Sequence, residues 1–214
     1  MTIVITGASR GIGATLAAQY KDAGEEVIGT ARSAGAGAVL DVTDPASHAA
    51  FAANLQGRPL DLLICNAGVY LDKGDDLDTG FGPDLWAQSF ATNVTGVFLT
   101  VQSLMPNLRA AKGAKIAIIA SQMGSQTRAP GGSYIYRASK AAVINLGRNL
   151  AVDLKPEGIA VGIYHPGWVR TDMGGDQGEI SVTESAQGLA KRIAALDLAQ
   201  TGAFETWDGR AHPF

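Results

Sequence analysis

Short runs of apolar residues alternate with longer amphipathic segments along most of the chain. The short runs are rich in β-branched side chains and are bounded by glycine, proline or polar residues, which is typical of strands buried on both faces. The runs are Thr2–Thr6, Glu26–Ala31, Leu60–Cys65, Lys115–Ala120 and Ile159–Tyr164. We expect two further short strands at Val39–Leu40 and Ala203–Thr206.

The segments between these runs have the spacing of helices. Apolar residues recur at intervals of three and four, so each segment has one apolar face. These stripes are Ile12, Leu16 and Tyr20 before Gly24, and Val143, Leu146, Leu150 and Leu154 before Pro156. Further helices are predicted over Pro45–Leu55 and Leu85–Ala111, and Ser181 with Glu184 forms a capping-box pattern ahead of a last helix.

Alternation of buried strands with helices predicts an α/β fold. Connections between parallel strands are right-handed, so the simplest arrangement is a doubly wound Rossmann sheet of about seven strands with helices on both faces. The sequence has no repeat or linker, and we expect a single domain over residues 1–214. Tyr70–Asp84 is the longest irregular stretch and is predicted to be a surface loop.

Composition excludes several classes of protein. The chain has 214 residues, of which 46% are apolar, and a formal net charge of −3, which argues against a nucleic-acid partner. No apolar run approaches the roughly 18–20 residues that span a membrane. Cys65 is the one cysteine, and the N-terminus lacks the pattern of a secretory signal, so we expect a cytoplasmic protein.

A glycine-rich turn joins the first predicted strand to the first helix. In this turn Gly7 permits a sharp bend, Gly11 lets a phosphate approach the backbone, and Gly13 lets the helix pack closely. The amides of such a turn and the helix N-terminus attract a pyrophosphate. The sequence therefore predicts a dinucleotide site, with a tight connection that binds no ligand as the alternative.

The residues after the second predicted strand indicate which dinucleotide is bound. An acidic residue there would bind the ribose 2′-hydroxyl of NAD, but Ala31 occupies this place and Arg32 follows it. Arg10 in the glycine turn is a second candidate for contact with a 2′-phosphate, because guanidinium groups bind phosphate well. We therefore expect NADP(H) to be preferred over NAD(H), unless both arginines are merely solvated.

Tyr136 and Lys140 are one helical turn apart, on the same face of a predicted helix. A nearby ammonium group stabilises a phenolate and lowers the pKa of the phenol. Such a tyrosine can donate a proton to a carbonyl oxygen, or accept one in the reverse reaction. A Tyr-x-x-x-Lys pair on its own is a weak signal, since surface pairs of this kind are common.

Several short motifs follow one another over nearly the whole chain. They are Thr6-Gly7-x-x-x-Gly11-x-Gly13, Cys65-Asn66-Ala67-Gly68, Asn93, Ser121, Tyr136-x-x-x-Lys140 and Pro166-Gly167-x-Val169-x-Thr171. In content and order this set resembles the short-chain dehydrogenase/reductase family. The segment from His165 to Gly175 and the Asp208-Gly209 pair resemble the sniffer/C-factor branch, which contains carbonyl reductases. Cys65 departs from the family, which usually has asparagine there.

The resemblance implies catalytic roles for four residues. Tyr136 would exchange a proton with the substrate oxygen, and Ser121 would orient that oxygen. Lys140 would lower the pKa of the tyrosine and bind the nicotinamide ribose. Asn93, within the long predicted helix, would hold a water that links Lys140 to solvent.

The resemblance also implies a cofactor-binding set. Its members are Gly7, Ser9, Arg10, Gly11, Ile12, Gly13, Arg32, Asp41, Val42, Asn66, Ala67, Gly68, Tyr136, Lys140, Pro166, Gly167, Val169 and Thr171. Structural roles are the alternatives for some of them. Asp41 would then cap a turn, Asn66–Gly68 would support the sheet, and Asn93 would be a polar residue in a kinked helix.

Other residues compete for the catalytic roles. Ser125 and Ser133 are rivals of Ser121, which we prefer because it ends an apolar strand. Tyr134 is a rival tyrosine, but Ala138 stands four residues after it. His165 has no second ligand at metal-binding spacing, so we expect no metal site.

These features predict an NADP(H)-dependent oxidoreductase acting on a small carbonyl or alcohol. A dinucleotide-binding regulatory or signalling protein with little turnover is the alternative. Trp86, Met123, Tyr134, Trp168 and Met173 are candidates for the substrate pocket, and the short segment Gly174–Ile180 predicts an open one. The resemblance further implies a homodimer or homotetramer formed through the long helices.

Overall fold

One parallel β-sheet organises the chain, and the computed structural model describes all residues except 34 and 36. Over the described residues the sheet has seven strands in the order β3-β2-β1-β4-β5-β6-β7, and all neighbouring strands run parallel. The strands are β1 (Thr2–Ile5), β2 (Glu26–Ala31), β3 (Ala38–Val39), β4 (Leu62–Cys65), β5 (Lys115–Ile119), β6 (Ala160–His165) and β7 (Phe204–Thr206). The predicted doubly wound sheet is confirmed, with strand ends shifted by one or two residues.

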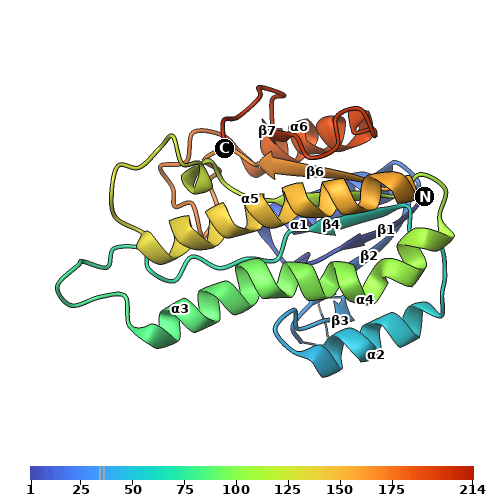
Figure 1. Cartoon of the computed structure of the whole chain (residues 1–214), viewed down its shortest axis with the longest axis horizontal. Helices are drawn as coiled ribbons and strands as arrows, with labels where there is room; N and C mark the ends of the chain where they lie inside the picture. Colours follow the sequence, from blue (N-terminus) through green and yellow to red (C-terminus); the bar gives the residue numbers. More distant parts are fainter. Residues whose placement is uncertain (34, 36) are drawn as a thin grey trace.

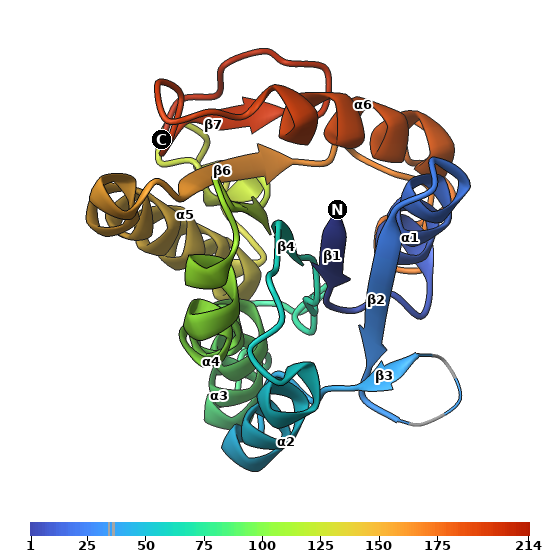
Figure 2. The same cartoon turned by 90° about the vertical axis from the view of Figure 1, so that its right-hand side faces the viewer.

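Helices cover both faces of the sheet, as Figure 1 and Figure 2 show from two directions. One face carries α1 (Gly11–Asp22) and α6 (Val182–Ala195). The other carries α2 (Pro45–Leu55), α4 (Gly96–Ala110) and α5 (Tyr134–Leu154), with α3 (Pro83–Phe90) preceding α4. Each face has its own apolar core, built from inward-facing strand residues and the apolar stripes of these helices.

Local sequence signals set the starts of two helices. The Ser181 hydroxyl accepts a hydrogen bond from the Glu184 amide at 3.1 Å, and the Glu184 carboxylate accepts one from the Ser181 amide at 2.8 Å. This confirms the predicted capping box of α6. At α2, the Asp44 carboxylate accepts from the Ala46 amide at 2.9 Å, and Pro45 occupies the first helical position.

The predicted helix over Leu85–Ala111 is not continuous. It is divided into α3 and α4 by a π-helical turn at Ala91–Thr95. The turn contains Asn93, whose side chain is buried against the loop after β4. π-Helical turns of this kind are frequent at functional sites.

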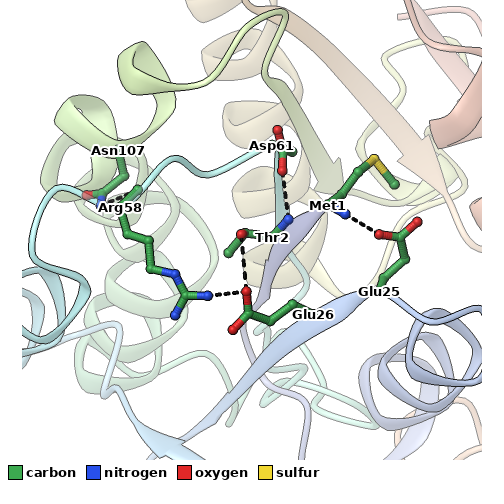
Figure 3. Close-up of polar contacts among 7 residues, drawn as sticks. All are labelled: Met1, Thr2, Glu25, Glu26, Arg58, Asp61 and Asn107. Carbon is green, nitrogen blue, oxygen red and sulfur yellow. Dashed lines mark hydrogen bonds and ion pairs between the residues drawn. The ribbon is translucent and has the colours of Figure 1, made fainter.

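A polar cluster ties the amino ends of the central strands together (Figure 3). The Thr2 amide donates to the Asp61 carboxylate at 2.7 Å, so β1 is fixed to the start of β4. Glu26 at the start of β2 forms an ion pair with Arg58, and the Arg58 carbonyl accepts from the Asn107 side chain of α4 at 2.8 Å. This cluster stabilises the edge of the sheet that faces away from the predicted site.

Candidate active site

The glycine turn after β1 lies directly against the segment that follows β4. Gly7 has φ of 66°, and a Cβ there would be 2.9 Å from the Ala67 Cα. The Asn66 side chain donates to the carbonyls of Thr6 and Gly7, both at 3.0 Å, and the Thr6 hydroxyl accepts from the Asn66 and Ala67 amides. Asn66 therefore has a structural role, since it fastens the glycine turn to the centre of the sheet.

The other two glycines of the turn serve different purposes. A Cβ at Gly13 would be 2.4 Å from the Gly7 carbonyl oxygen, so only glycine lets α1 pack this closely, as predicted. A Cβ at Gly11 would meet Thr171 alone, at 3.7 Å, which leaves open space over the N-terminus of α1. Within the described chain, α1 has no side-chain cap and no acidic residue in its first turn, so its amides suit an anion.

Arg10 stands at this helix start with an exposed side chain. Its guanidinium forms an ion pair with Asp172 at 2.7 Å, and both side chains are more than three-quarters exposed. The pair links the glycine turn to the loop after β6 above the N-terminus of α1. Ser9 is exposed beside it, whereas Ile12 packs on the core below.

The predicted adenosine side of the site lies beyond the ends of β2 and β3. Arg32 follows β2 and is exposed. The Asp41 carboxylate accepts from the Thr43 amide at 2.9 Å and the Thr43 hydroxyl at 2.7 Å, and these bonds lower the pKa of Asp41, with a smaller contribution from Arg32. Asp41 thus caps the turn before α2, and the buried Val42 packs against α4.

Ser121 and Tyr136 meet at the end of β5. Ser121 is buried and accepts from the Met123 amide at 3.1 Å, and its hydroxyl lies near enough to the Tyr136 phenol to lower the pKa of that phenol. Lys140, one turn further along α5, donates to the Ile119 carbonyl at 3.1 Å, and its Nζ lies 5.7 Å from the centre of the Tyr136 ring. The three predicted groups are therefore brought together at the carboxyl edge of the sheet.

Burial has the largest effect on the pKa values of Tyr136 and Lys140. It raises the pKa of Tyr136 to about 12, although the neighbouring Ser121 acts in the opposite direction. It also lowers the pKa of Lys140 to about 8. The predicted lowering of the tyrosine pKa by Lys140 stays a prediction, because the groups that shift this pKa here are Ser121, Tyr70 and Asp72, in addition to burial. The Lys140 ammonium group contacts the Ile119 carbonyl. A phenolate at Tyr136 would be poorly solvated, because the side chain is buried.

Asn93 supports the site from the π-helical turn. Its Oδ1 accepts from the Val69 amide at 2.8 Å, and its Nδ2 donates to the Val69 carbonyl at 2.9 Å and to Ser139 at 3.0 Å. A Cβ at Gly68 would be 3.3 Å from this Oδ1 and 3.6 Å from the Lys140 Nζ. Gly68 thus leaves room for the side chains of both Asn93 and Lys140.

The loop after β6 closes the other side of the site. Pro166 begins it, and Gly167 has φ of 90° and lies against Ile180 and Trp207, where a Cβ would be 2.5 Å from the Ile180 side chain. Val169 is buried and pairs with Ile180, while the Thr171 hydroxyl accepts from the Gly174 amide at 3.0 Å.

This loop folds back on itself as a compact turn. Trp168 and Met173 are 45% and 40% exposed, so they are surface residues beside the site.

The chain matches the family described as short chain dehydrogenase over residues 1–181. It belongs to the short-chain dehydrogenase/reductase family. It is therefore an NAD(P)-dependent oxidoreductase of this type. The predicted motifs and the matched range agree, since the glycine turn, Asn93, Ser121 and the Tyr136–Lys140 pair all lie inside it.

Individual members of the family are similar over most or all of this chain. The C-signal of Myxococcus xanthus is 36% identical over 169 residues, which is 77% of this chain and 99% of that protein. An NADPH-bound carbonyl reductase from chicken fatty liver has 29% identity and a TM-score of 0.91, with 100% and 98% of the two chains covered.

The carbonyl reductase Sniffer of D. melanogaster has 25% identity and a TM-score of 0.92, with 100% and 99% covered. Similarity to these proteins confirms the predicted resemblance to the sniffer/C-factor branch of the short-chain dehydrogenase/reductase family.

The rivals of the predicted residues lie apart from the Ser121–Tyr136 contact. Ser125 pairs with Thr127 at 2.9 Å, and Tyr134 is 41% exposed and contacts Phe81 edge to face. Burial lowers the pKa of His165 to about 3, so this side chain is neutral at physiological pH. Among the described residues no group of His, Cys, Asp and Glu side chains is arranged to hold a metal, and no helix has the length and apolar character to cross a membrane.

Two residues of the site were missed by sequence reasoning. The stretch Tyr70–Asp84 was expected to be a surface loop, but Asp72 in it is fully buried and Tyr70 stacks on the Tyr136 ring. The loop is therefore buried near its start, whereas Leu77 and its neighbours are exposed as predicted. Asp72 stands among several acidic residues in an irregular segment, and no periodic pattern distinguishes it from them.

Proposed function

We propose that this protein is an NADPH-dependent reductase of small aldehydes and ketones, with Tyr136 as the general acid. The proposal rests on the position of the Ser121 and Tyr136 side chains, which lie close together at the carboxyl edge of the sheet, with Lys140 beside the Tyr136 ring. Two hydroxyl groups converging in this way can both hydrogen-bond one carbonyl oxygen. Ligands of doubly wound sheets bind at this edge.

The residues around the glycine turn fit a dinucleotide. The uncapped amides at the start of α1 would hold the pyrophosphate, and Gly11 leaves room for it. Asn66–Gly68 and the loop from Pro166 to Thr171 would border the ribose and nicotinamide. When bound, the dinucleotide supplies a hydride to the carbonyl carbon, or accepts one from the alcohol.

The chain's own side chains handle the proton. Tyr136 donates its phenolic proton to the substrate oxygen, which becomes the hydroxyl of the product. Ser121 donates a hydrogen bond to the same oxygen and thereby orients it. Lys140 stabilises the phenolate that remains after the transfer, until a proton from solvent restores the phenol. Because burial raises the pKa of Tyr136, the phenol is protonated and ready to donate at neutral pH.

Arg32 and Arg10 support the choice of NADPH over NADH. Both side chains are exposed on the predicted adenosine side, and the similar chicken carbonyl reductase holds NADPH. Removing Arg32 (Arg32→Ala) should weaken NADPH binding by about 1.5–3 kcal/mol while leaving NADH binding unchanged. Fluorescence titration of both dinucleotides measures this difference, and an equal effect on the two would contradict the assignment.

The function itself is tested by following NADPH absorbance with a panel of small aldehydes and ketones. Turnover of at least one member is the expected result, and the alcohol product should appear in equal amount. The similarity to C-signal favours a second candidate function, a dinucleotide-binding regulatory protein with little turnover. Tight NADPH binding without turnover across the panel would favour that candidate instead.

We also propose that the protein assembles as a homodimer or homotetramer through α4 and α5. Phe98 on α4 is 41% exposed and Val152 on α5 is 72% exposed, which leaves apolar surface on the two long helices. Association would remove such surface from water.

A further inference from the structure

Asp72 is fully buried in the loop after β4, and its carboxylate points at the start of α5. Its Oδ2 accepts from the Ile135 amide at 2.8 Å and from the Tyr136 amide at 3.3 Å, and its Oδ1 accepts from the Tyr136 amide at 3.2 Å. Burying a carboxylate is costly unless it is hydrogen-bonded or paired. These contacts therefore tie the position of Asp72 to the backbone that carries the Tyr136 side chain.

The start of α5 has no capping side chain of its own within the described chain. Ser133, the residue before the helix, has φ of 49° and makes no hydrogen bond from its side chain to the first turn. The first amides of a helix need partners, and a negative charge near them is favourable. Asp72 supplies the hydrogen-bond acceptors and the negative charge, although it stands 63 residues before Ile135 in the sequence.

Tyr70, two residues before Asp72, holds the Tyr136 side chain. The two rings are stacked, with centroids 4.2 Å apart and an angle of 21° between their planes. The Tyr70 hydroxyl forms a hydrogen bond with the Ser133 hydroxyl at the start of α5. The backbone of Tyr136 is thus held by Asp72, and one face of its ring is covered by Tyr70.

We propose that Asp72 and Tyr70 are positioning residues for Tyr136, which aim its hydroxyl and favour its protonated form. The inference rests on the proposed function, because it assigns the two residues to the proton-donating step of that reaction. Neither residue has to touch the substrate to have this effect. The loop after β4 would then set both the direction and the proton affinity of the general acid.

The groups around Tyr136 on the neighbouring elements support this role of Asp72 and Tyr70. Ser121 at the end of β5 lowers the pKa of the phenol, whereas Tyr70 and Asp72 raise that pKa, in addition to the larger effect of burial. The Lys140 Nζ of α5 lies 5.7 Å from the ring centre, and the neutral amide of Asn93 in the π-helical turn bonds Val69 and Ser139. A carboxylate held this close opposes formation of the phenolate.

The proton affinity is measured most directly by NMR on protein labelled with ¹³C at tyrosine Cζ, with the Tyr136 signal assigned from Tyr136→Phe. In the wild type this signal should stay that of a phenol up to the highest pH at which the fold persists. Asp72→Asn keeps an acceptor oxygen but removes the charge, and should lower the pKa of Tyr136 by about one unit or more. Asp78→Asn, an exposed carboxylate in the same loop, is the matched control and should leave the signal unchanged.

An unchanged Tyr136 titration in folded Asp72→Asn would overturn the role of Asp72. This readout does not depend on turnover. A wild type without carbonyl reduction would therefore count against the proposed function, and not against the effect of Asp72 on the phenol.

The role of Tyr70 is tested by two substitutions in the holoenzyme. Tyr70→Ala removes the stacked ring and should lower kcat about tenfold with little change in KM for NADPH, as expected for loss of an aromatic pair. Tyr70→Phe retains the ring and should stay within about twofold of the wild type. Leu77→Ala, at an exposed apolar side chain in the same loop as Tyr70, is the control and should retain kcat. Equal kcat in Tyr70→Ala and the wild type would overturn this part of the proposal.

Discussion

At the scale of single residues, Lys140 carries a large electrostatic cost. Its ammonium group is buried beside the Ile119 carbonyl, and burial lowers its pKa from the ordinary 10.5 to about 8. Between these two pH values the unfolded chain binds a proton that the folded chain does not. The penalty for burying the charge is therefore present below about pH 8 and decreases as the pH rises toward 10.5.

This sign gives a prediction about stability. The free energy of unfolding of the wild type, relative to that of Lys140→Met, should rise by about 2 kcal/mol between about pH 8 and pH 10. Tyr136 has a raised pKa, so its own stabilising contribution is fully present below pH 10 and is lost only above that value. Urea unfolding of both proteins across this range measures the difference. A constant difference would show that Lys140 stays fully charged in the folded protein.

At the scale of elements, the site depends on contacts between the turns that follow the strands. The Arg10–Asp172 pair joins the glycine turn to the loop after β6, on the rim of the proposed cofactor site. Arg10 is also the proposed second partner of a 2′-phosphate. If both assignments hold, Asp172 competes with the dinucleotide for the same guanidinium group.

Substituting Asp172 therefore has a predicted direction. An exposed ion pair is worth about 0–1 kcal/mol, so Asp172→Asn should tighten NADPH binding by at most about fivefold. NADH has no 2′-phosphate, and its dissociation constant should stay unchanged. Titration at low salt makes the effect largest. Weaker NADPH binding in this variant would mean that Arg10 needs Asp172 in order to be held in place.

The elements also show how far the sequence can be interpreted. Helix α6 and the sheet were predictable, because a capping box and buried β-branched runs are local signals. The π-helical turn around Asn93 was not, since its apolar spacing resembles that of an ordinary helix. Asp72 was missed because its partners are 63 and 64 residues away, and residue spacing along the sequence does not predict such a distant contact.

The effect of burial on the pKa of Tyr136 was not predictable for a related reason. The Tyr-x-x-x-Lys spacing shows that the two side chains share a helix face, but it does not show how deeply they are buried. In this fold burial raises the pKa of Tyr136 and lowers that of Lys140.

At the scale of the whole molecule, the two long helices α4 and α5 lie side by side (Figure 1) and leave apolar side chains on the surface. The proposed assembly would cover this face and leave the carboxyl edge of the sheet accessible. It would also restrict the movement of α5, which carries Tyr136 and Lys140. Assembly and activity would then be linked.

This assembly predicts the effect of a charge on the exposed face. Phe98→Asp should shift the wild-type dimer or tetramer to a smaller species, because an unpaired charge is costly to bury. Light scattering after size-exclusion chromatography measures the mass. Leu77→Asp, at an exposed apolar side chain outside these helices, is the control and should leave the mass unchanged. A monomeric wild type would refute the proposed assembly.

The central claim is that the phenol of Tyr136 supplies the proton in carbonyl reduction. The most direct test compares kcat of the wild type and Tyr136→Phe with the same carbonyl substrate, together with the NADPH dissociation constant of each. Loss of a general acid should lower kcat by about 10²- to 10⁴-fold and leave NADPH binding within about threefold. Equal kcat in the two proteins, with NADPH bound equally well, would contradict the claim.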